Sequence, residues 1–397
     1  MNLHEFVIGL RESYPDIRGL RRMLGKIRIM ILNRRRLPAS LTEQCERDPE
    51  LKRSTVAKYS QKWKHYITPD IQKTKEALAD DRNGLSPESY TDMVFCRMAY
   101  GFSPSEYVQF ELADKSYEQR RTFFSDTDRY LFVYHMSDIS DLQIFHDKIK
   151  TYKHFSRFYK RDLVPISGQG DRDKYLEFVR KHPVFVKKDA LGMAGHGVEL
   201  VDINKCGKTP EEFFAGILKE GWTVLEECIV QGEEMARFNP SSINTVRCVT
   251  MSTRHGVITP YCCLRVGRSG SFVDNASSGG LLAIIDPKTG IVSSDGFDRN
   301  NDIQETHPDT GVRFKGFQLP EWQEMLATVR EMMQVLPSVK YVGWDMAHTD
   351  RGWVMIEGNC MGQLMAPQFK KETGIREEML GYMKDIDLMV PLKNGSL

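Results

Sequence analysis

The sequence lacks the features that mark several specialised classes of protein. No apolar stretch reaches the ~20 residues that a membrane-spanning helix needs, and no signal peptide opens the chain. Neither sign of charge dominates, since 55 Lys and Arg residues stand against 54 Asp and Glu residues. The sequence therefore predicts no membrane-spanning helix, and the charge balance does not argue for a nucleic-acid partner.

The eight cysteines show no pattern of a disulfide framework. No CxxC pair occurs, and the adjacent Cys262 and Cys263 have a poor geometry for a disulfide or a zinc cage. Reduced thiols fit this usage best, so we expect a cytoplasmic protein.

The composition that remains is that of an ordinary globular protein. At 397 residues, 41% hydrophobic and 27% charged, the chain is long enough for two or three domains. Helical patterns dominate the first 140 residues, where Ser103 and Ser105 are candidate caps of a helix that continues to about Phe124. From about Val184, β-strand patterns alternate with helical patches. The expected fold class is α+β with a mainly helical N-terminal region.

The N-terminal region is basic. Residues 1–40 hold nine Arg or Lys residues and three acids, and apolar residues recur beside them near helical spacing. Such a helix could lie on an anionic membrane. We favour the alternative, in which it packs on its own domain and its charges are solvated.

The stretch "GWDMAHTDRGWVMIEGN", residues 343–359, predicts a β-hairpin with a turn at "TDRG". Depending on the register, Asp345 falls opposite Ile356 or opposite Glu357. The second register sets two carboxylates side by side, with Asn359 on the same face as Glu357. Three oxygen-bearing side chains would then converge.

Two interpretations of these acids stay open. Carboxylate oxygens suit Mg²⁺, which commonly takes one or two carboxylates together with phosphates and waters. The alternative is a solvated hairpin face whose acids meet Lys or Arg.

A glycine-rich loop lies in "FVKKDALGMAGHGVELV". A strand ends in Lys187 and Lys188, and Gly192, Gly195 and Gly197 follow before the next strand. Glycines let backbone N–H groups approach phosphate oxygens, and a lysine offers them a charge. The loop matches neither a Walker A motif nor a Rossmann fingerprint, and most such loops merely reverse the chain.

Further charged candidates lie in residues 224–251. Glu226 ends an apolar strand, and Glu233 or Glu234 follows a short turn, which would suit hydrogen bonds to adenine and ribose. Arg247 on a later strand could reach an anionic reaction centre. Taken singly, each of these charges is more often part of a salt bridge.

Together, these residues resemble the ordered pattern of the ATP-grasp superfamily, from about residue 148 to about residue 368. The phrases "YGFSPSEY", "SSINTVR", "GWDMA" and "IEGN" resemble its sugar-transfer-associated branch, which is related to α-L-glutamate ligases and linked to surface-polysaccharide synthesis, and extend the match back to about residue 95. The matching positions, in chain order, are Lys148, Lys187, Gly192 to Gly197, Glu226, Asn244, Arg247, Asp345, Glu357 and Asn359.

The resemblance implies two α+β lobes that hold ATP between them. It implies that Asp345, Glu357 and Asn359 bind Mg²⁺ between the β- and γ-phosphates, and that Lys148 and Lys187 contact the α- and β-phosphates. The glycine-rich loop would cover the phosphates.

The resemblance also implies a reaction. Glu226, with Glu233 or Glu234, would recognise adenine and ribose. A substrate carboxylate would take the γ-phosphoryl group, and an amine would then attack the acyl phosphate. Asn244 belongs to the same catalytic strand as Arg247, and Arg247 and Arg265 would stabilise the tetrahedral oxyanion.

Three functions remain as hypotheses. The first is a carboxylate–amine ligase that acts on small molecules and uses ATP and Mg²⁺. The second is a kinase acting on a sugar or other hydroxyl, and the third is a non-catalytic nucleotide-binding partner. Product analysis separates the first two, because a kinase leaves the phosphate on its product.

The expected divisions follow the same resemblance. Residues 1–90 form the basic helical region, 91–165 a helical segment, 166–224 the small lobe with its loop, and 225–397 the large lobe with the metal site. The "DNASSGG" stretch, residues 274–280, is either an acceptor or phosphate loop or a plain turn.

Overall fold

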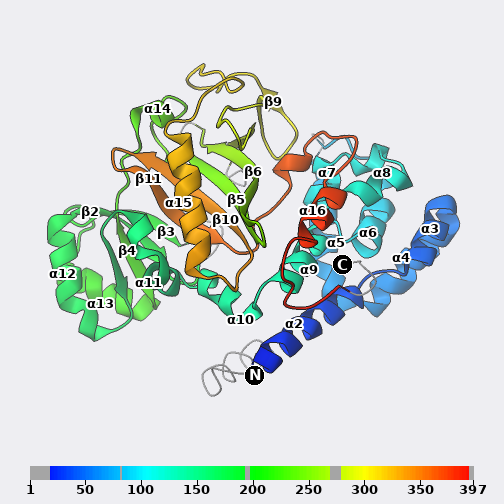
Figure 1. Cartoon of the computed structure of the whole chain (residues 1–397), viewed down its shortest axis with the longest axis horizontal. Helices are drawn as coiled ribbons and strands as arrows, with labels where there is room; N and C mark the ends of the chain where they lie inside the picture. The colour runs from blue at the N-terminus through cyan, green and yellow to red at the C-terminus, as the bar shows by residue number, and fades with distance from the viewer. Residues whose placement is uncertain (1–17, 81–82, 193–196, 269–278, 393–397) are drawn as a thin grey trace.

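The fold has three parts in chain order: a helical region, a small lobe built on a four-stranded sheet, and a large lobe built on a seven-stranded sheet (Figure 1). The structure is a computed structural model, and it describes residues 18–80, 83–192, 197–268 and 279–392. The expected α+β class with a mainly helical N-terminal region is confirmed.

Residues 37–123 of the helical region pack around an aromatic core of their own, while α9 to α11 share the core of the large lobe. Phe95, Phe102, Phe110 and Phe123 are buried together there, and α2 lies against α9. Its elements are α2 (Arg18–Asn33), α3 (Ala39–Arg47), α4 (Pro49–Lys62), α5 (Lys64–Ala79), α6 (Ser89–Ala99), α7 (Pro104–Gln109), η2 (Leu112–Asp114), α8 (Tyr117–Thr122), α9 (Asp126–Met136), α10 (Ile139–Leu142), η3 (Gln143–His146) and α11 (Lys148–Tyr159).

The expected long helix up to Phe124 is wrong, although one of its caps is right. Ser103 caps α7 through a capping box with Glu106. The chain then turns at Glu111, which has a left-handed φ of 52°, and Ser116 caps the separate helix α8. Two closely spaced N-caps and a left-handed residue divide the segment into short pieces.

The small lobe is an antiparallel sheet in the order β1-β4-β2-β3. Helices α12 and α13 pack on one face of the sheet through a common apolar core. Its elements are β1 (Leu163–Ile166), η4 (Gln169–Asp171), α12 (Arg172–Lys181), β2 (Val184–Asp189), β3 (Val198–Asp202), α13 (Pro210–Glu220) and β4 (Thr223–Glu227).

The two faces of this small sheet differ in chemistry. Phe185 and Leu225 lie in the apolar core beneath α12 and α13. Successive side chains of a strand point to opposite faces, so Lys187 shares the helix-covered face with Phe185. Lys188 lies on the other face, where it meets Glu226.

The large lobe is an antiparallel sheet in the order β11-β10-β5-β6-β7-β8-β9. Its elements are α14 (Glu233–Ala236), β5 (Thr245–Thr253), β6 (Gly256–Val266), β7 (Leu281–Ile285), β8 (Gly296–Phe297), β9 (Ile303–Gln304), α15 (Trp322–Val335), β10 (Tyr341–Thr349), β11 (Gly352–Asn359), η6 (Ala366–Gln368) and α16 (Arg376–Met383).

One face of the large sheet carries the core. Helix α15 crosses this face, and α11 packs beside it (Figure 1). Trp344 of β10 is buried here, with its ring 5.3 Å from that of Phe155. Because strand side chains alternate, the next residue, Asp345, points to the opposite face, together with Arg247 of the neighbouring strand.

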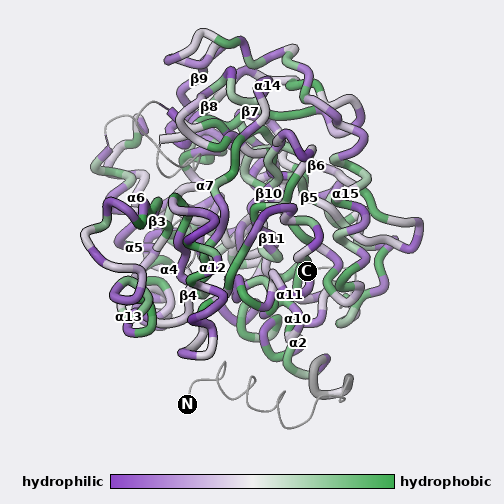
Figure 2. The backbone as a smooth tube through the Cα atoms, turned by 90° about the vertical axis from the view of Figure 1, so that its left-hand side faces the viewer, coloured by the Kyte–Doolittle hydropathy of each residue, from purple (hydrophilic) through white to green (hydrophobic). Residues whose placement is uncertain are grey.

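Hydrophobic and hydrophilic residues are interleaved along the chain (Figure 2). Within the described ranges, no helix combines the length and the apolar character that crossing a bilayer requires.

Candidate nucleotide and metal site

The hairpin of β10 and β11 has the register that places two carboxylates side by side. Thr349 pairs with Gly352 across the turn, and Asp345 pairs with Glu357. The regular register from the turn would set Asp345 opposite Ile356, but a bulge between Asp345 and Met346 shifts the pairing by one residue. The bulge therefore aims both carboxylates at the same spot.

Asp345 is buried and held by two arginines. Arg247, directly opposite on β5, donates through Nε to Oδ1 and through Nη2 to Oδ2, the latter at 2.8 Å. Arg265 donates from Nη1 to Oδ2 at 2.8 Å. Burial opposes ionisation of Asp345, but the two arginines outweigh it and hold the pKa of this carboxyl below its usual value.

The side-chain oxygens of Asp345, Glu357 and Asn359 are of the chemical type that binds a magnesium ion. Glu357 is exposed, and Asn359 donates from Nδ2 to Glu357 Oε1 at 3.1 Å and to Asp345 Oδ2 at 3.4 Å. Exchanging the oxygen and nitrogen of the Asn359 amide would present a third oxygen. Oδ2 of Asp345 is already crowded by three donors, whereas Oδ1 accepts only from Arg247 among the described residues and keeps a lone pair.

Lys148 lies at the first turn of α11 and reaches the end of β2. Its Nζ donates to the carbonyl of Asp189 at 3.0 Å and to that of Gly192. Burial lowers the pKa of Lys148, the attraction of Glu357 opposes this, and Lys188 adds to the lowering. The charges of Lys188 and Glu357 therefore both act on Lys148, and these three side chains form the charged cluster of the site.

Lys188, and not Lys187, lies on the face of the small sheet that carries Glu226. Nζ of Lys187 pairs with Glu199 at 3.2 Å and with Glu220 at 2.5 Å, on the helix-covered face. Nζ of Lys188 lies 2.9 Å from Oε1 of Glu226. Lys187, the lysine expected to contact phosphate, is thus held by two glutamates on the opposite face of the sheet.

Glu226 is the centre of a buried ion network. Arg161 donates to its Oε2 from Nη2 at 2.6 Å, opposite the contact with Lys188. Burial raises the pKa of Glu226, but Lys188 and Arg161 outweigh that effect and lower it to about 2. Glu226 is therefore ionised at neutral pH and forms ion pairs with two cations, Arg161 and Lys188.

Arg161 was missed by the sequence analysis. Its Nη1 also donates to the carbonyl of Met355 on β11 at 2.7 Å, so one side chain joins β4 of the small lobe to β11 of the large lobe. Within the charged run "YKRD", no local signal distinguishes this arginine from its solvated neighbours.

Within the described residues, three other candidates have no hydrogen bond or ion pair with Lys148, Lys188 or Glu357. Glu233 and Glu234 are exposed at the start of α14, where Glu234 pairs with Arg237 at 2.9 Å. Asn244 is buried, and its Nδ2 donates to the carbonyls of Met235 and Asn239, both at 2.9 Å. Its amide holds the loop before β5 in place.

The loop glycines are only partly covered by the structure. Gly192 accepts from Lys148, and the carbonyl of Gly197 accepts from the amide of Asp189 at 3.1 Å. Gly195 lies outside the described residues, as do residues 274–278 of the "DNASSGG" stretch.

Several solved structures resemble the chain at low sequence identity. D-alanyl-alanine synthetase A from Vibrio cholerae matches 61% of this chain and 65% of its own, with 11% identity and a TM-score of 0.37. N5-carboxyaminoimidazole ribonucleotide synthetase from Thermotoga maritima matches 64% and 52%, with 12% identity and a TM-score of 0.37. D-alanine–D-alanine ligase from Helicobacter pylori matches 64% of both chains, with 12% identity and a TM-score of 0.38. In each case less than two thirds of the other chain is covered, and the similarity is too low to transfer an activity.

The family comparison is more extensive. No curated protein matches the sequence. The family model described as sugar-transfer associated ATP-grasp matches residues 131–384, more than half of the chain. This range contains Lys148, Lys188, Glu226 and the β10–β11 carboxylates. The chain therefore belongs to the sugar-transfer-associated ATP-grasp family.

Proposed function

We propose that the chain is an ATP-dependent ligase that joins a small-molecule carboxylate to an amine and releases ADP and phosphate. The observation that carries the proposal is the pairing of two carboxylates, Asp345 and Glu357, across the β10–β11 hairpin, with Lys148 close enough to Glu357 for their charges to interact. Cations beside a paired set of oxygen ligands suit a metal-bound polyphosphate. Family membership supports ATP as that polyphosphate.

Each side chain has a role in holding the nucleotide. Lys148 and Lys188 would contact phosphate oxygens, and Glu226 would orient Lys188 rather than bind adenine, because Arg161 and Lys188 already engage its carboxylate. Glu357, Asn359 and the remaining lone pair of Asp345 would hold Mg²⁺. The chemistry that Mg²⁺ supplies is neutralisation of phosphate charge during transfer.

The arginines would serve the acyl group. An oxygen of the substrate carboxylate attacks the γ-phosphorus, the bond to the β-phosphate oxygen breaks, and ADP leaves. The amine nitrogen then attacks the acyl carbon, loses a proton, and inorganic phosphate departs. Arg247 and Arg265 would stabilise the oxyanion of this second step, because their guanidinium groups lie on the same sheet face as the carboxylates.

The wider role follows from the family alone. Its description as sugar-transfer associated supports a place in surface-polysaccharide or related biosynthesis.

The direct test is incubation of the full chain with ATP, Mg²⁺ and pooled acids and amines, followed by measurement of ADP and phosphate and by mass spectrometry of products. We expect ADP and phosphate in equal amounts and a new amide. Phosphate retained on an acceptor hydroxyl would instead identify a kinase.

A variant connects the activity to the site. Glu357→Gln keeps the size of an exposed side chain, so the fold should survive while turnover is lost. Glu324→Gln, an equally exposed change on α15 at the opposite face of the large sheet, is the matched control. Normal turnover by Glu357→Gln would contradict the metal assignment.

A further inference from the structure

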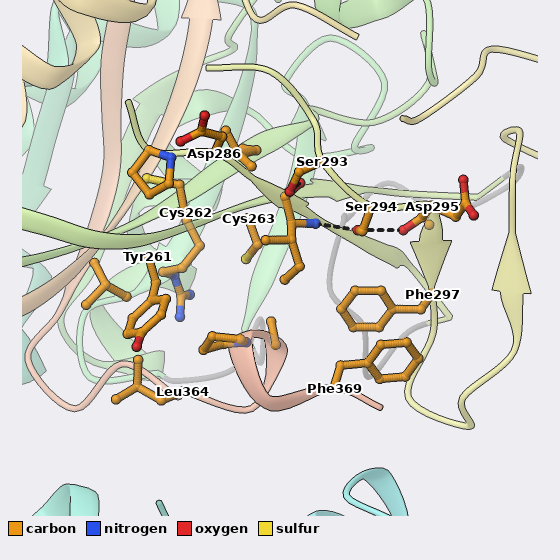
Figure 3. Close-up of a pocket in the computed structure, with 18 of the residues that line it drawn as sticks. Tyr261, Cys262, Cys263, Asp286, Ser293, Ser294, Asp295, Phe297, Leu364 and Phe369 are labelled. Carbon is orange, nitrogen blue, oxygen red and sulfur yellow. Dashed lines mark hydrogen bonds between the residues drawn. The ribbon is translucent and has the colours of Figure 1, made fainter. Parts of the chain in front are cut away.

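A cavity of about 600 Å³ lies beside the proposed reaction centre. Its floor is the outer face of strands β5, β6 and β7, and the chain around η6 closes it from the other side (Figure 3). Val249, Tyr261 and Ile284 contribute from the sheet, and Leu364 and Phe369 from the covering segment. Its volume is within the range of cavities that bind small molecules.

The walls of the cavity are mainly apolar. The rings of Phe297 and Phe369 stack with centroids 3.8 Å apart and planes 8° from parallel, and together they form one side (Figure 3). Tyr261 forms part of the other side near Leu364. The hydroxyl of Tyr261 donates to Glu378 at 2.5 Å, so it is already satisfied.

A single cation marks the end of the cavity that adjoins the site. Arg247 lines the cavity and also contacts Asp345. Among the described residues Arg247 uses Nε and Nη2 on Asp345, which leaves the N–H groups of Nη1 for another anion. Four further charged residues line the cavity and are exposed or half-buried: Asp286, Asp295, Lys315 and Lys371.

We propose that this cavity binds the acid substrate, and that this acid has an aromatic or branched aliphatic body attached to its carboxylate. The proposal rests on the ligase function proposed above. The carboxylate would meet Nη1 of Arg247 beside the phosphate cluster, and the body would lie between Tyr261 and the stacked Phe297–Phe369 pair. A sugar acid would lose the hydration of its hydroxyls against the Phe297–Phe369 pair and Leu364, because these apolar side chains return no hydrogen bonds.

The experiment compares two monocarboxylates, 4-phenylbutanoate and glucuronate, with the full-length chain. Binding is measured by ligand-observed NMR in the presence of Mg²⁺ and a non-hydrolysable ATP analogue, and ADP release is measured with ATP and pooled amines. We expect 4-phenylbutanoate to bind and to stimulate ADP release, and glucuronate to do neither.

Two phenylalanine variants test the place of binding. Phe369→Ala should weaken binding of 4-phenylbutanoate by roughly tenfold, since it removes one aromatic wall. It should raise the KM for that acid more than it lowers kcat. Phe213→Ala is the control, because Phe213 is also half-buried but lies in the core of the small lobe.

The outcomes separate the two proposals. If glucuronate stimulates ADP release and the aromatic acid does not, the ligase stands and the apolar substrate class is wrong. If the aromatic acid binds and Phe369→Ala weakens it, but no acid stimulates ADP release, the cavity assignment stands and the ligase fails. Equal binding to wild type and to Phe369→Ala would overturn the cavity assignment.

Discussion

Lys188 has the strand position from which a lysine of the small lobe can reach a phosphate. It shares the open sheet face with Glu226, while Lys187 is tied to Glu199 and Glu220 on the covered face. We expect Lys188→Met to weaken ATP binding by roughly tenfold to a hundredfold, the value of one charge-assisted hydrogen bond. Lys187→Met should change the affinity for ATP by less than about twofold. Titration of both variants with ATP measures the two affinities. Equal losses in both variants would contradict the assignment.

The choice between these two lysines could not be made from the sequence. In "VFVKK", apolar residues occupy both parities of the strand, so neither face is marked as the core. Phe185 faces the core only because α12 and α13 pack on its side, and that packing involves residues far along the chain. The sequence indicates a lysine at this strand end, but not the face of the sheet on which it lies.

The ionisation of Glu226 predicts a pH dependence of stability. Lys188 and Arg161 lower its pKa from 4.5 to about 2, so the stabilisation is complete above about pH 4.5 and is lost as the pH falls toward 2. Its size is on the order of 3 kcal/mol. Glu226→Gln should therefore lower the free energy of unfolding strongly at pH 7, as measured with urea.

The pH series supplies the check for Glu226. The difference between wild type and Glu226→Gln should shrink steadily as the pH falls below 4.5, while the exposed variant Glu233→Gln tracks wild type throughout. A difference that stays constant with pH would show that the loss comes from shape rather than charge.

At the scale of elements, the presence of the β10–β11 hairpin was predictable from the sequence, but its register was not. The two strands and their turn follow from apolar runs around "TDRG". The register does not, because it contains a bulge beside Asp345 and because β10 also pairs with β5, a strand about 100 residues earlier in the chain. Alternation within two strands alone leaves both pairings open, and the structure has the one that opposes Asp345 and Glu357.

The segment after η6 depends on a glycine for its attachment to the helical region. A Cβ on Gly374 would lie 2.2 Å from Cα of Phe123, a backbone atom that cannot move aside cheaply. The Gly374 amide also donates to Thr122 Oγ1 at 2.8 Å. We expect Gly374→Ala to destabilise the protein by about 1–3 kcal/mol or more, because overpacking forces the backbone to shift. Urea unfolding measures this loss.

Gly381 supplies the matched substitution. It lies inside helix α16, and a Cβ there meets no atom within 4 Å. Gly381→Ala should therefore stabilise by about 0.5–1 kcal/mol through helix propensity. Loss of stability of equal size in both variants would refute the close contact at Phe123.

At the scale of the whole molecule, the ATP-grasp fold was predictable from the order of spaced residues along the chain, and it is confirmed. The way the two lobes touch was not. Their contact includes Arg161, whose partners Glu226 and Met355 are 65 and 194 residues away. Long-range partners of a single arginine leave no periodic trace in a sequence.

Two arginines join the lobes, and they should differ sharply in importance. Arg161 is 4% exposed and pairs with the buried Glu226, whereas Arg351 is 52% exposed and pairs with Glu227 at 2.9 Å. Arg161→Met should cost about 3 kcal/mol of stability, because it leaves a buried carboxylate with only Lys188. Arg351→Gln should cost less than about 1 kcal/mol, as is usual for exposed ion pairs.

Hydrogen exchange can locate the effect of these changes. Arg161→Met should speed exchange in β1 and β4 of the small lobe, where Glu226 loses its second partner, while the centre of the large sheet at β5 and β6 stays protected. Arg351→Gln should leave both regions as in wild type. If Arg161→Met exposed β5 and β6 as much as β4, the arginine would support the fold in general rather than the contact between the lobes.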